Sequence, residues 1–375
     1  MRIGFLWCAS LVAAGAAQAQ QPTSQTEPLF RTTTRTVEVS VVATWSNGSA
    51  VRDLTQDELR LFDDGREQTI RMFDKVQNGR SDARRGGEPP YAGPGARRLS
   101  ILLLDALNTS WSDQIYARRA AAGALEQIQA GDRVAIFVLM GNGLRLLHDF
   151  SSDYASLKAL VTRFSGETPR GGSDPPATSY SAEFSYSDLL QSNKPTSGLW
   201  AIIRQRQNIL DTLDSLTAIA RLVKGAPGQK SLLWLSAGFP LQIEERGGYG
   251  GTLGSESFHN EAAQTMRELN AANVSLYPID ARGLAMSSRA YINIATMQEL
   301  AAQTGGKAYY NSNGLTSMVR AALDDSRDSY VLTYAPSDIQ DDGRFHSIRL
   351  RTSRRGVQLR YRPGYYADAR KAAKR

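Results

Sequence analysis

The residues that decide the fold are Leu99–Ser110, which read LSILLLDALNTS. Ile101–Leu104 is an uninterrupted apolar run that stops at a carboxylate, Asp105, and the short polar loop Asn108–Ser110 follows. An apolar run of this length is typical of a strand buried on both faces, as in the middle of a parallel sheet. Polar groups directly after such a strand lie at the edge where open α/β sheets bind ligands. The stretch therefore predicts a central strand with a candidate site at its end.

From this strand to residue 325, apolar runs alternate with helical patterns. Further strands are predicted at Val134–Met140, Ser231–Ser236, Val274–Asp280 and Lys307–Asn311, and helices at Asp113–Gln129, Tyr154–Phe164, Leu199–Leu222, Glu261–Ala272, Ala295–Thr304 and Leu315–Asp324. This alternation predicts an α/β fold: a doubly wound, mainly parallel sheet with helices on both faces. The turn at 141–143 is too short for a crossover, so Leu144–His148 is expected to be an antiparallel edge strand.

Two β-rich segments flank the α/β region 99–325. Residues 30–77 are predicted to form a small N-terminal β module, and residues 78–98, rich in Gly, Pro and Arg, a linker. Residues 326–368 are predicted to form a C-terminal β module with a hairpin of His346–Thr352 and Val357–Tyr361. One face of that hairpin would carry a row of arginines that suits an acidic envelope surface: Arg349, Arg351, Arg360 and Arg362.

The first residues have the composition of an export signal. Arg2 precedes the apolar segment Ile3–Ala16, and Ala17–Ala19 has the small-residue pattern of a cleavage site, so residues 1–19 are predicted to be a signal peptide. The single cysteine, Cys8, lies within it, which leaves no thiols after cleavage. We expect a periplasmic or extracellular protein without a transmembrane segment. The formal net charge is +7, but no nucleic-acid-binding motif is found, and nucleic acid is not an expected partner.

The succession of motifs resembles a von Willebrand factor A domain, and in particular an exported bacterial family of von Willebrand factor A-related proteins abundant in acidobacteria. The stretches that carry the resemblance are VRDLTQDELRLFDDGREQTI, LLLDALNTSWSDQIYARRA, GDRVAIFVL, HDFSSD, KSLLWLSAGFPL, YPIDARGL and YVLTYAP with DGRFHSIRLR and YRPGYYA. The resemblance implies a protein-binding module, which in such domains often works through a divalent cation.

The same resemblance implies where a metal would be held. Such domains use D-x-S-x-S after the first strand, a Thr from a later loop, here Thr168 or Thr196, and an Asp after the fourth strand. In this chain Leu107 replaces the first Ser, and Ser236-Ala237-Gly238 replaces the usual T-D-G, so the site is expected to be degenerate. The oxygen ligands that remain for Mg²⁺ are Asp105, Asn108, Thr109, Ser110 and Asp280. Alternatively, Asp105 binds only loop amides or caps the next helix, which requires no metal.

The main alternative to a binding module is an enzyme of the α/β hydrolase type. Trp234–Gly238 contains half of the nucleophile elbow of α/β hydrolases, and Ser236, Asp280 and His346 follow the chain order of such a triad. The other histidines, His148 and His259, show no metal-ligand spacing. We expect first a non-enzymatic, exported binding protein that presents the sheet edge and the long loops 165–198 and 238–257. The alternatives are an envelope-associated structural protein that uses the arginine hairpin, and a degenerate hydrolase.

Overall fold

The structure is a computed structural model that describes residues 36–77, 80–81, 99–126, 132–166, 196–226, 228–246, 252–284, 287–325, 328–337 and 344–367. The predicted signal peptide and nearly all of the predicted linker lie outside these residues, as do Thr168 and most of the predicted loop 165–198. Within the described helices, none is both long enough and apolar enough to cross a bilayer.

The central sheet has β6 (Leu99–Asp105) as its middle strand. Its order is β12-β9-β6-β7-β8, with β12 (Val274–Asp280), β9 (Lys230–Ser236), β6 and β7 (Arg133–Met140) all parallel. β8 (Gly143–Ser151) pairs antiparallel with β7 at one edge. The structure thus confirms the mainly parallel sheet with one antiparallel edge strand. The predicted strand 307–311 is reduced to a parallel bridge between Ile279 and Tyr309.

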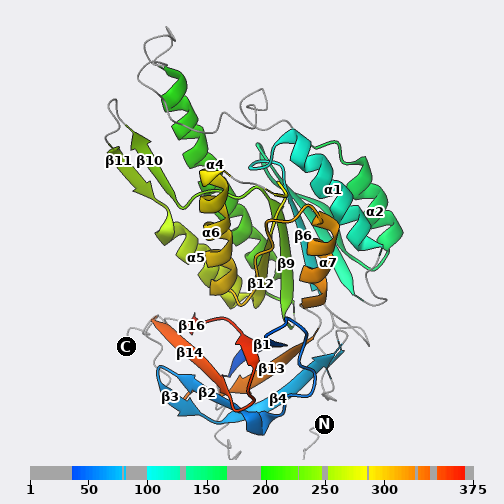
Figure 1. Cartoon of the computed structure of the whole chain (residues 1–375), viewed down its shortest axis with the longest axis vertical. Coiled ribbons are helices and arrows are strands. Elements are labelled where there is room, and N and C mark those ends of the chain that lie inside the picture. Colours follow the sequence, from blue (N-terminus) through cyan, green and yellow to red (C-terminus); the bar gives the residue numbers. More distant parts are fainter. Residues whose placement is uncertain are drawn as a thin grey trace, which may run out of the picture. The chain divides into compact units, whose positions relative to one another are not determined.

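Helices cover both faces of this sheet, because successive residues of β6 point to opposite sides. Leu102 and Leu104 pack in one apolar cluster with side chains of α1 (Trp111–Leu125), α2 (Tyr154–Arg163) and α7 (Leu315–Asp325). Ile101 and Leu103 pack in another with α4 (Thr196–Val223), α5 (His259–Ala271) and α6 (Ser288–Gln303). Figure 1 shows the two helical layers on either side of the strands. The burial of the central strands on both faces explains why their middle residues are mainly apolar.

The segment 238–257, which was predicted to be a second long loop, contains regular secondary structure. It contains a β-hairpin of β10 (Gln242–Arg246) and β11 (Thr252–Ser257), with residues 247–251 outside the described range. Ile243 of β10 is buried in the same apolar cluster as α4 and α5. The sequence did not predict these two strands, because the glycines of the segment interrupt the alternation of apolar and polar residues that is typical of a strand.

The N-terminal and C-terminal β segments form shared sheets. One sheet has the order β15-β1-β13-β4-β5, in which β13 (Ser329–Tyr334) lies between β1 (Val37–Trp45) and β4 (Ile70–Gln77). The other has the order β16-β14-β2-β3. The remaining strands are β5 (Arg80–Ser81), β2 (Leu59–Asp63), β3 (Arg66–Gln68), β14 (Phe345–Thr352), β15 (Val357–Arg360) and β16 (Gly364–Tyr366), and a short 3₁₀ helix, η1 (Gln56–Glu58), precedes β2. Side chains from both sheets share one apolar core. We call this unit the β module.

The predicted arginine hairpin is wrong in its pairing. β14 pairs with β2 and β16, whereas β15 pairs with β1 in the other sheet. The four arginines therefore do not form one row. Arg349 and Arg351 are exposed on β14, and the Arg351 guanidinium lies over the Phe62 ring. The other two are used internally: Arg360 bonds to Asp325, and Arg362 donates to the carbonyls of Asn270 and Glu38.

Candidate functional site

The carboxylate of Asp105 is the centre of the polar network at the end of β6. Its side chain is buried, at 2% exposure. Oδ1 accepts a hydrogen bond from the backbone N–H of Asn108 at 2.9 Å. Oδ2 accepts from Asn108 Nδ2 at 2.8 Å, Trp234 Nε1 at 3.0 Å and Ser236 Oγ at 2.6 Å. Burial raises the pKa of the Asp105 carboxyl, and the hydrogen bonds from Ser236, Asn108 and Trp234 oppose that rise.

The loop after β6 is tied to the loop after β9 by backbone and hydroxyl groups. Thr109 Oγ1 accepts from the N–H of Ala237 at 3.1 Å, and Ser236 Oγ accepts from the N–H of Gly238 at 2.8 Å. Gly238 has a φ of +71°, and a Cβ there would lie 3.0 Å from Met297 Cε. Glycine is therefore favoured by the backbone conformation, and a larger residue would also need the Met297 side chain to shift. Trp234–Gly238, which the sequence suggested as half of a nucleophile elbow, instead brings the loop after β9 into hydrogen-bond contact with the loop after β6.

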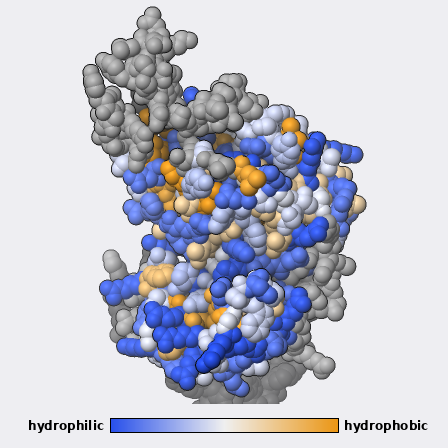
Figure 2. Space-filling view, viewed as in Figure 1, coloured by the Kyte–Doolittle hydropathy of each residue, from blue (hydrophilic) through white to orange (hydrophobic). Residues whose placement is uncertain are grey.

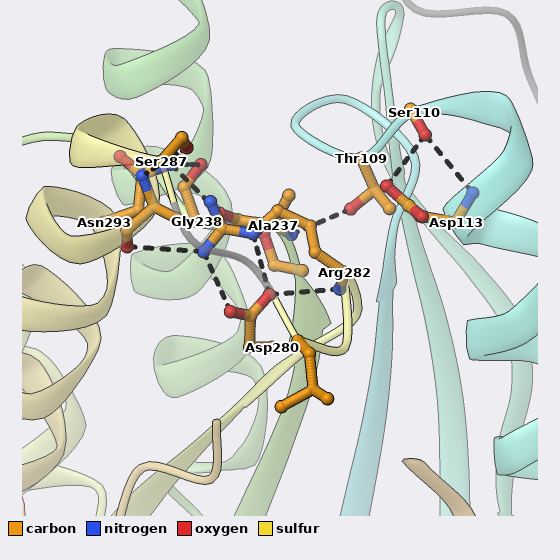
Figure 3. A network of polar contacts seen from close by, with 12 residues as sticks. Thr109, Ser110, Asp113, Ala237, Gly238, Asp280, Arg282, Ser287 and Asn293 are labelled. Atoms are coloured by element: carbon orange, nitrogen blue, oxygen red, sulfur yellow. Dashed lines mark hydrogen bonds and ion pairs between the residues drawn. The ribbon is translucent and has the colours of Figure 1, made fainter. Parts of the chain in front are cut away.

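Ser110 is a helix cap. Its Oγ accepts from the N–H of Asp113 at 3.2 Å and donates to the Asp113 carboxylate at 2.8 Å. This pairing satisfies an otherwise free N–H in the first turn of α1. Figure 3 shows Ser110 and Asp113 at the start of α1, with Thr109 directed toward Ala237. The oxygens of Ser110 and Thr109 therefore already have protein partners.

Asp280, at the end of β12, is fully buried and neutralised by an arginine two residues later. Its Oδ1 accepts from Arg282 Nε at 2.8 Å and from the Arg282 N–H at 3.0 Å, and its Oδ2 accepts from Arg282 Nη2 at 2.9 Å. Such a bidentate pair gives a buried carboxylate a charge partner with fixed geometry. Figure 3 shows this pair beside Asn293, whose Nδ2 donates to the carbonyls of Ala237 and Gly238.

The structure brings the predicted metal ligands to one sheet edge, but each one is engaged with the protein. Asp105 and Asn108 contact each other, Thr109 contacts Ala237, Ser110 contacts Asp113, and Asp280 contacts Arg282. Leu107, at the position of the family's first Ser, is buried in the core. Mg²⁺ needs oxygen ligands that are free to turn toward it. As arranged here, the residues do not fit such an ion, and Mg²⁺ binding stays a prediction.

Sequence reasoning missed the groups that complete this network. Trp234, Thr212, Arg282 and Asn293 supply donors or acceptors to it. The spacing Asp280-x-Arg282 after a buried strand was the one available signal, because an arginine so close can turn back onto the carboxylate. Thr212 was not predictable, since its Oγ1 meets Asn108 across 104 positions of sequence.

The residues of the hydrolase alternative are not assembled. Ser236 and Asp280 end adjacent strands and are paired in register. The Ser236 hydroxyl donates to Asp105, however, and Asp280 is bonded to Arg282. His346 belongs to β14 of the β module, where its Nδ1 lies 3.1 Å from Asp64 Oδ2. A serine nucleophile needs a base within hydrogen-bond reach, and the contacts of the described residues give Ser236 none.

The segment after β12 exposes large apolar side chains beside the network. Leu284 is 63% exposed, and Tyr291 and Ile292, in the first turns of α6, are each 54% exposed. Figure 2 shows apolar residues gathered over α6 on the face that it draws. Because these residues follow the carboxyl end of a parallel strand, they belong to the sheet edge at which open α/β folds bind ligands.

Comparison with known proteins finds only solved structures of low identity. No family model and no curated protein sequence matches the chain. Similar solved structures include an aerotolerance-related membrane protein from Bacteroides fragilis, in a form with multiple mutations to serine (12% identity, 61% of this chain, 98% of that chain, TM-score 0.35). Others are the SpRpn10 VWA domain (10% identity, 59% of this chain, 93% of that chain, TM-score 0.30) and the TFIIH p34 N-terminal domain (11% identity, 60% of this chain, 97% of that chain, TM-score 0.33).

The chain's own topology is the firmer basis for classification. A parallel sheet with β6 in the middle, an antiparallel β8 at one edge and helices on both faces is consistent with a von Willebrand factor A-like fold. The fold and the sheet edge together define the class as an α/β module with a mainly parallel sheet, followed in the same chain by strands of a β module. Fold alone does not assign a function, so the function has to be argued from the residues at the sheet edge.

Proposed function

We propose that the chain is a non-enzymatic, exported protein-interaction module that binds its partner at the carboxyl edge of the central sheet. The observation that carries this proposal is the exposure of Leu284, Tyr291 and Ile292 at that edge. Loops and helix starts on a rigid sheet are where recognition usually resides. Export is inferred from the signal-like residues 1–19.

We further propose that partner binding here uses apolar contact in place of a metal-bridged carboxylate. Asp105 accepts four hydrogen bonds and Asp280 pairs with Arg282, so both carboxylates act to hold the loops in place. A fixed loop lowers the conformational entropy lost on binding. Exposed aromatic and aliphatic side chains beside such a loop are suited to form the dry centre of a protein interface.

Site-specific photo-crosslinking tests this proposal. A photoreactive phenylalanine analogue at Leu284 or Ile292 should give discrete crosslinked species in an envelope extract of the source organism. The matched control is Leu222, which is 64% exposed and lies at the end of α4, before β9 begins and hence at the opposite end of the sheet. Equal crosslinking from Leu222 and Ile292 would contradict a partner site at the carboxyl edge.

A further inference from the structure

A cluster of metal-ligating groups lies in the β module, apart from the residues at the edge of the central sheet. Asp63 ends β2, Asp64 follows it in the turn to β3, and His346 lies near the start of β14, which pairs with β2. One ligand atom from each of the three lies within 4.8 Å of the other two. The sequence did not point to this cluster, because 282 positions separate Asp64 from His346 and only the pairing of β2 with β14 brings them together.

The buried carboxylate of Asp63 lacks a partner on one side. Its Oδ2 accepts hydrogen bonds from the hydroxyls of Tyr334 at 2.8 Å and Tyr365 at 3.0 Å. Its Oδ1 is buried and accepts no hydrogen bond from the residues that the structure describes, although Asp63 is only 5% exposed. A buried carboxylate oxygen without a donor is costly. The unmet oxygen is the one directed at the cluster, since it lies 3.7 Å from His346 Nδ1.

The two separations that involve His346 are close to those between the ligand atoms of a small cation, and the Asp63 and Asp64 oxygens lie within 4.8 Å of each other. His346 Nδ1 lies 3.1 Å from Asp64 Oδ2 and 3.7 Å from Asp63 Oδ1. Tetrahedral zinc with bonds of about 2.0–2.1 Å holds its ligand atoms about 3.4 Å apart, a value between these two. The three donors therefore need only small side-chain movements to bind one ion.

Neighbouring groups hold the three side chains in these positions. The tyrosine hydroxyls fix Asp63, and the N–H of Ser347 donates to Asp64 Oδ1 at 2.7 Å, which leaves Oδ2 on the side of His346. The imidazole of His346 stacks on the ring of Tyr365, with centroids 5.2 Å apart. Hydrogen bonds that orient the ligands in this manner are a regular feature of metal sites.

We propose that Asp63, Asp64 and His346 bind a divalent transition-metal ion of the zinc type. One imidazole with two carboxylates suits such an ion, whereas Mg²⁺ and Ca²⁺ favour oxygen ligands alone. Three protein ligands leave a fourth position for water or for a group from a partner. Because Asp64 is 51% exposed, that position is reached from solvent. The ion would link the turn between β2 and β3 to strand β14.

Zinc titration of the purified full-length chain tests the site. The chain has three histidines, His148, His259 and His346, so nitrogen–proton correlation spectra can follow each imidazole separately. Zn²⁺ alone should bind at one ion per chain and shift the imidazole signals of His346. In calorimetry, His346→Gln and Asp64→Asn should each weaken Zn²⁺ binding at least tenfold. His259→Gln is the matched control outside the cluster and should leave the affinity unchanged.

Two outcomes would overturn the proposal. If Zn²⁺ leaves the His346 signals unmoved, the cluster is only an imidazole hydrogen-bonded to two carboxylates. If Asp105→Asn abolishes the zinc affinity and His346→Gln preserves it, the ion binds at the sheet edge instead. Asp64→Asn, at an exposed turn, decides the question should His346→Gln fail to fold, and circular dichroism of each variant shows whether it has folded.

Discussion

The hydroxyl of Ser236, at the end of β9, donates a hydrogen bond of 2.6 Å to the carboxylate of Asp105, at the end of the neighbouring β6. The two residues that suggested chemistry from sequence, one as a nucleophile and one as a metal ligand, are therefore partners of each other. Their bond is buried and part of a network in which every contact to Asp105 comes from a donor. The network joins two loops at the edge of the sheet, which suggests a structural role for both residues.

Asp105→Asn should destabilise the fold more than its small change in shape implies. An amide offers one acceptor oxygen where the carboxylate offers two, and its NH₂ group would face the donors of Asn108 or Trp234. We expect a loss of about 2–4 kcal/mol in the free energy of unfolding, as for a broken buried hydrogen bond to a charged group. Urea unfolding measures it. Asp214→Asn, on an exposed position of α4, is the control and should change little.

Mg²⁺ titration checks whether the sheet edge binds metal. We expect calorimetry with Mg²⁺ to give the same trace for the wild type and for Asp105→Ala, because the carboxylate oxygens already accept hydrogen bonds. A saturable heat in the wild type that Asp105→Ala removes would show instead that Asn108 and Ser236 turn aside for the ion. That result would restore the cation-dependent mode of binding.

The fold of the α/β region could be predicted from sequence because its signals are local. The four buried strands are apolar runs, and the turn at 141–143 is too short for anything but an antiparallel return. β12 was predicted with the bounds that the structure shows, Val274–Asp280. The β module was harder, because β13 inserts between β1 and β4 from more than 250 positions away. The apolar and polar pattern of a single strand does not show which distant strand it pairs with.

The positions of Asp105 and Asp280 at strand ends could be predicted from sequence, but their hydrogen-bond partners could not. Asp105 and Asp280 stand where strands end, and both lie at the expected edge. What each carboxylate binds depends on residues from other elements, such as Trp234 for Asp105. The Asp63–Asp64–His346 cluster could not be predicted for the same reason. In the sequence Asp63 and Asp64 indicate only a turn, and it is the pairing of β14 with β2 that brings His346 beside them.

Arg282→Ala should destabilise the fold strongly. It leaves the fully buried Asp280 without its charge partner, and breaking a buried pair in this way typically costs about 3–5 kcal/mol. The double variant Asp280→Asn with Arg282→Ala should recover part of that loss, since no buried charge remains. Chemical denaturation of the three proteins gives both values. Equal stability of the wild type and Arg282→Ala would mean that water replaces the guanidinium.

A chain that ends at residue 326 should lose the β module. Without β13, β1 and β4 have no shared neighbour, and the apolar side chains of Val39 and Leu61 lose the covering of Leu332 and Leu350. We expect spectra of residues 36–77 to become those of an unfolded segment, as measured by the dispersion of backbone amide signals. Retained dispersion in this segment would support a separate N-terminal module, as the sequence predicted.

Lys230 should make stability depend on pH in the alkaline range. Its ammonium is buried at 2% exposure and donates to the carbonyls of Ala226 at 2.6 Å and Ala272 at 2.7 Å. Burial lowers the pKa of Lys230 from 10.5 to about 8, and the nearby Glu38 carboxylate partly opposes this. Between these two pH values the unfolded chain keeps a proton that the folded chain has released, so the free energy of unfolding rises with pH.

The Lys230→Met variant isolates this contribution. From pH 8 to 10.5 the wild type should gain about 3 kcal/mol relative to the variant, at 1.36 kcal/mol per pKa unit. The comparison with the variant is needed because buried tyrosines act in the opposite sense: burial raises the pKa of Tyr334, so the folded chain keeps that proton longer than the unfolded chain. Urea midpoints across this range measure the difference. Parallel pH profiles for the two proteins would show that Lys230 titrates as it does in water.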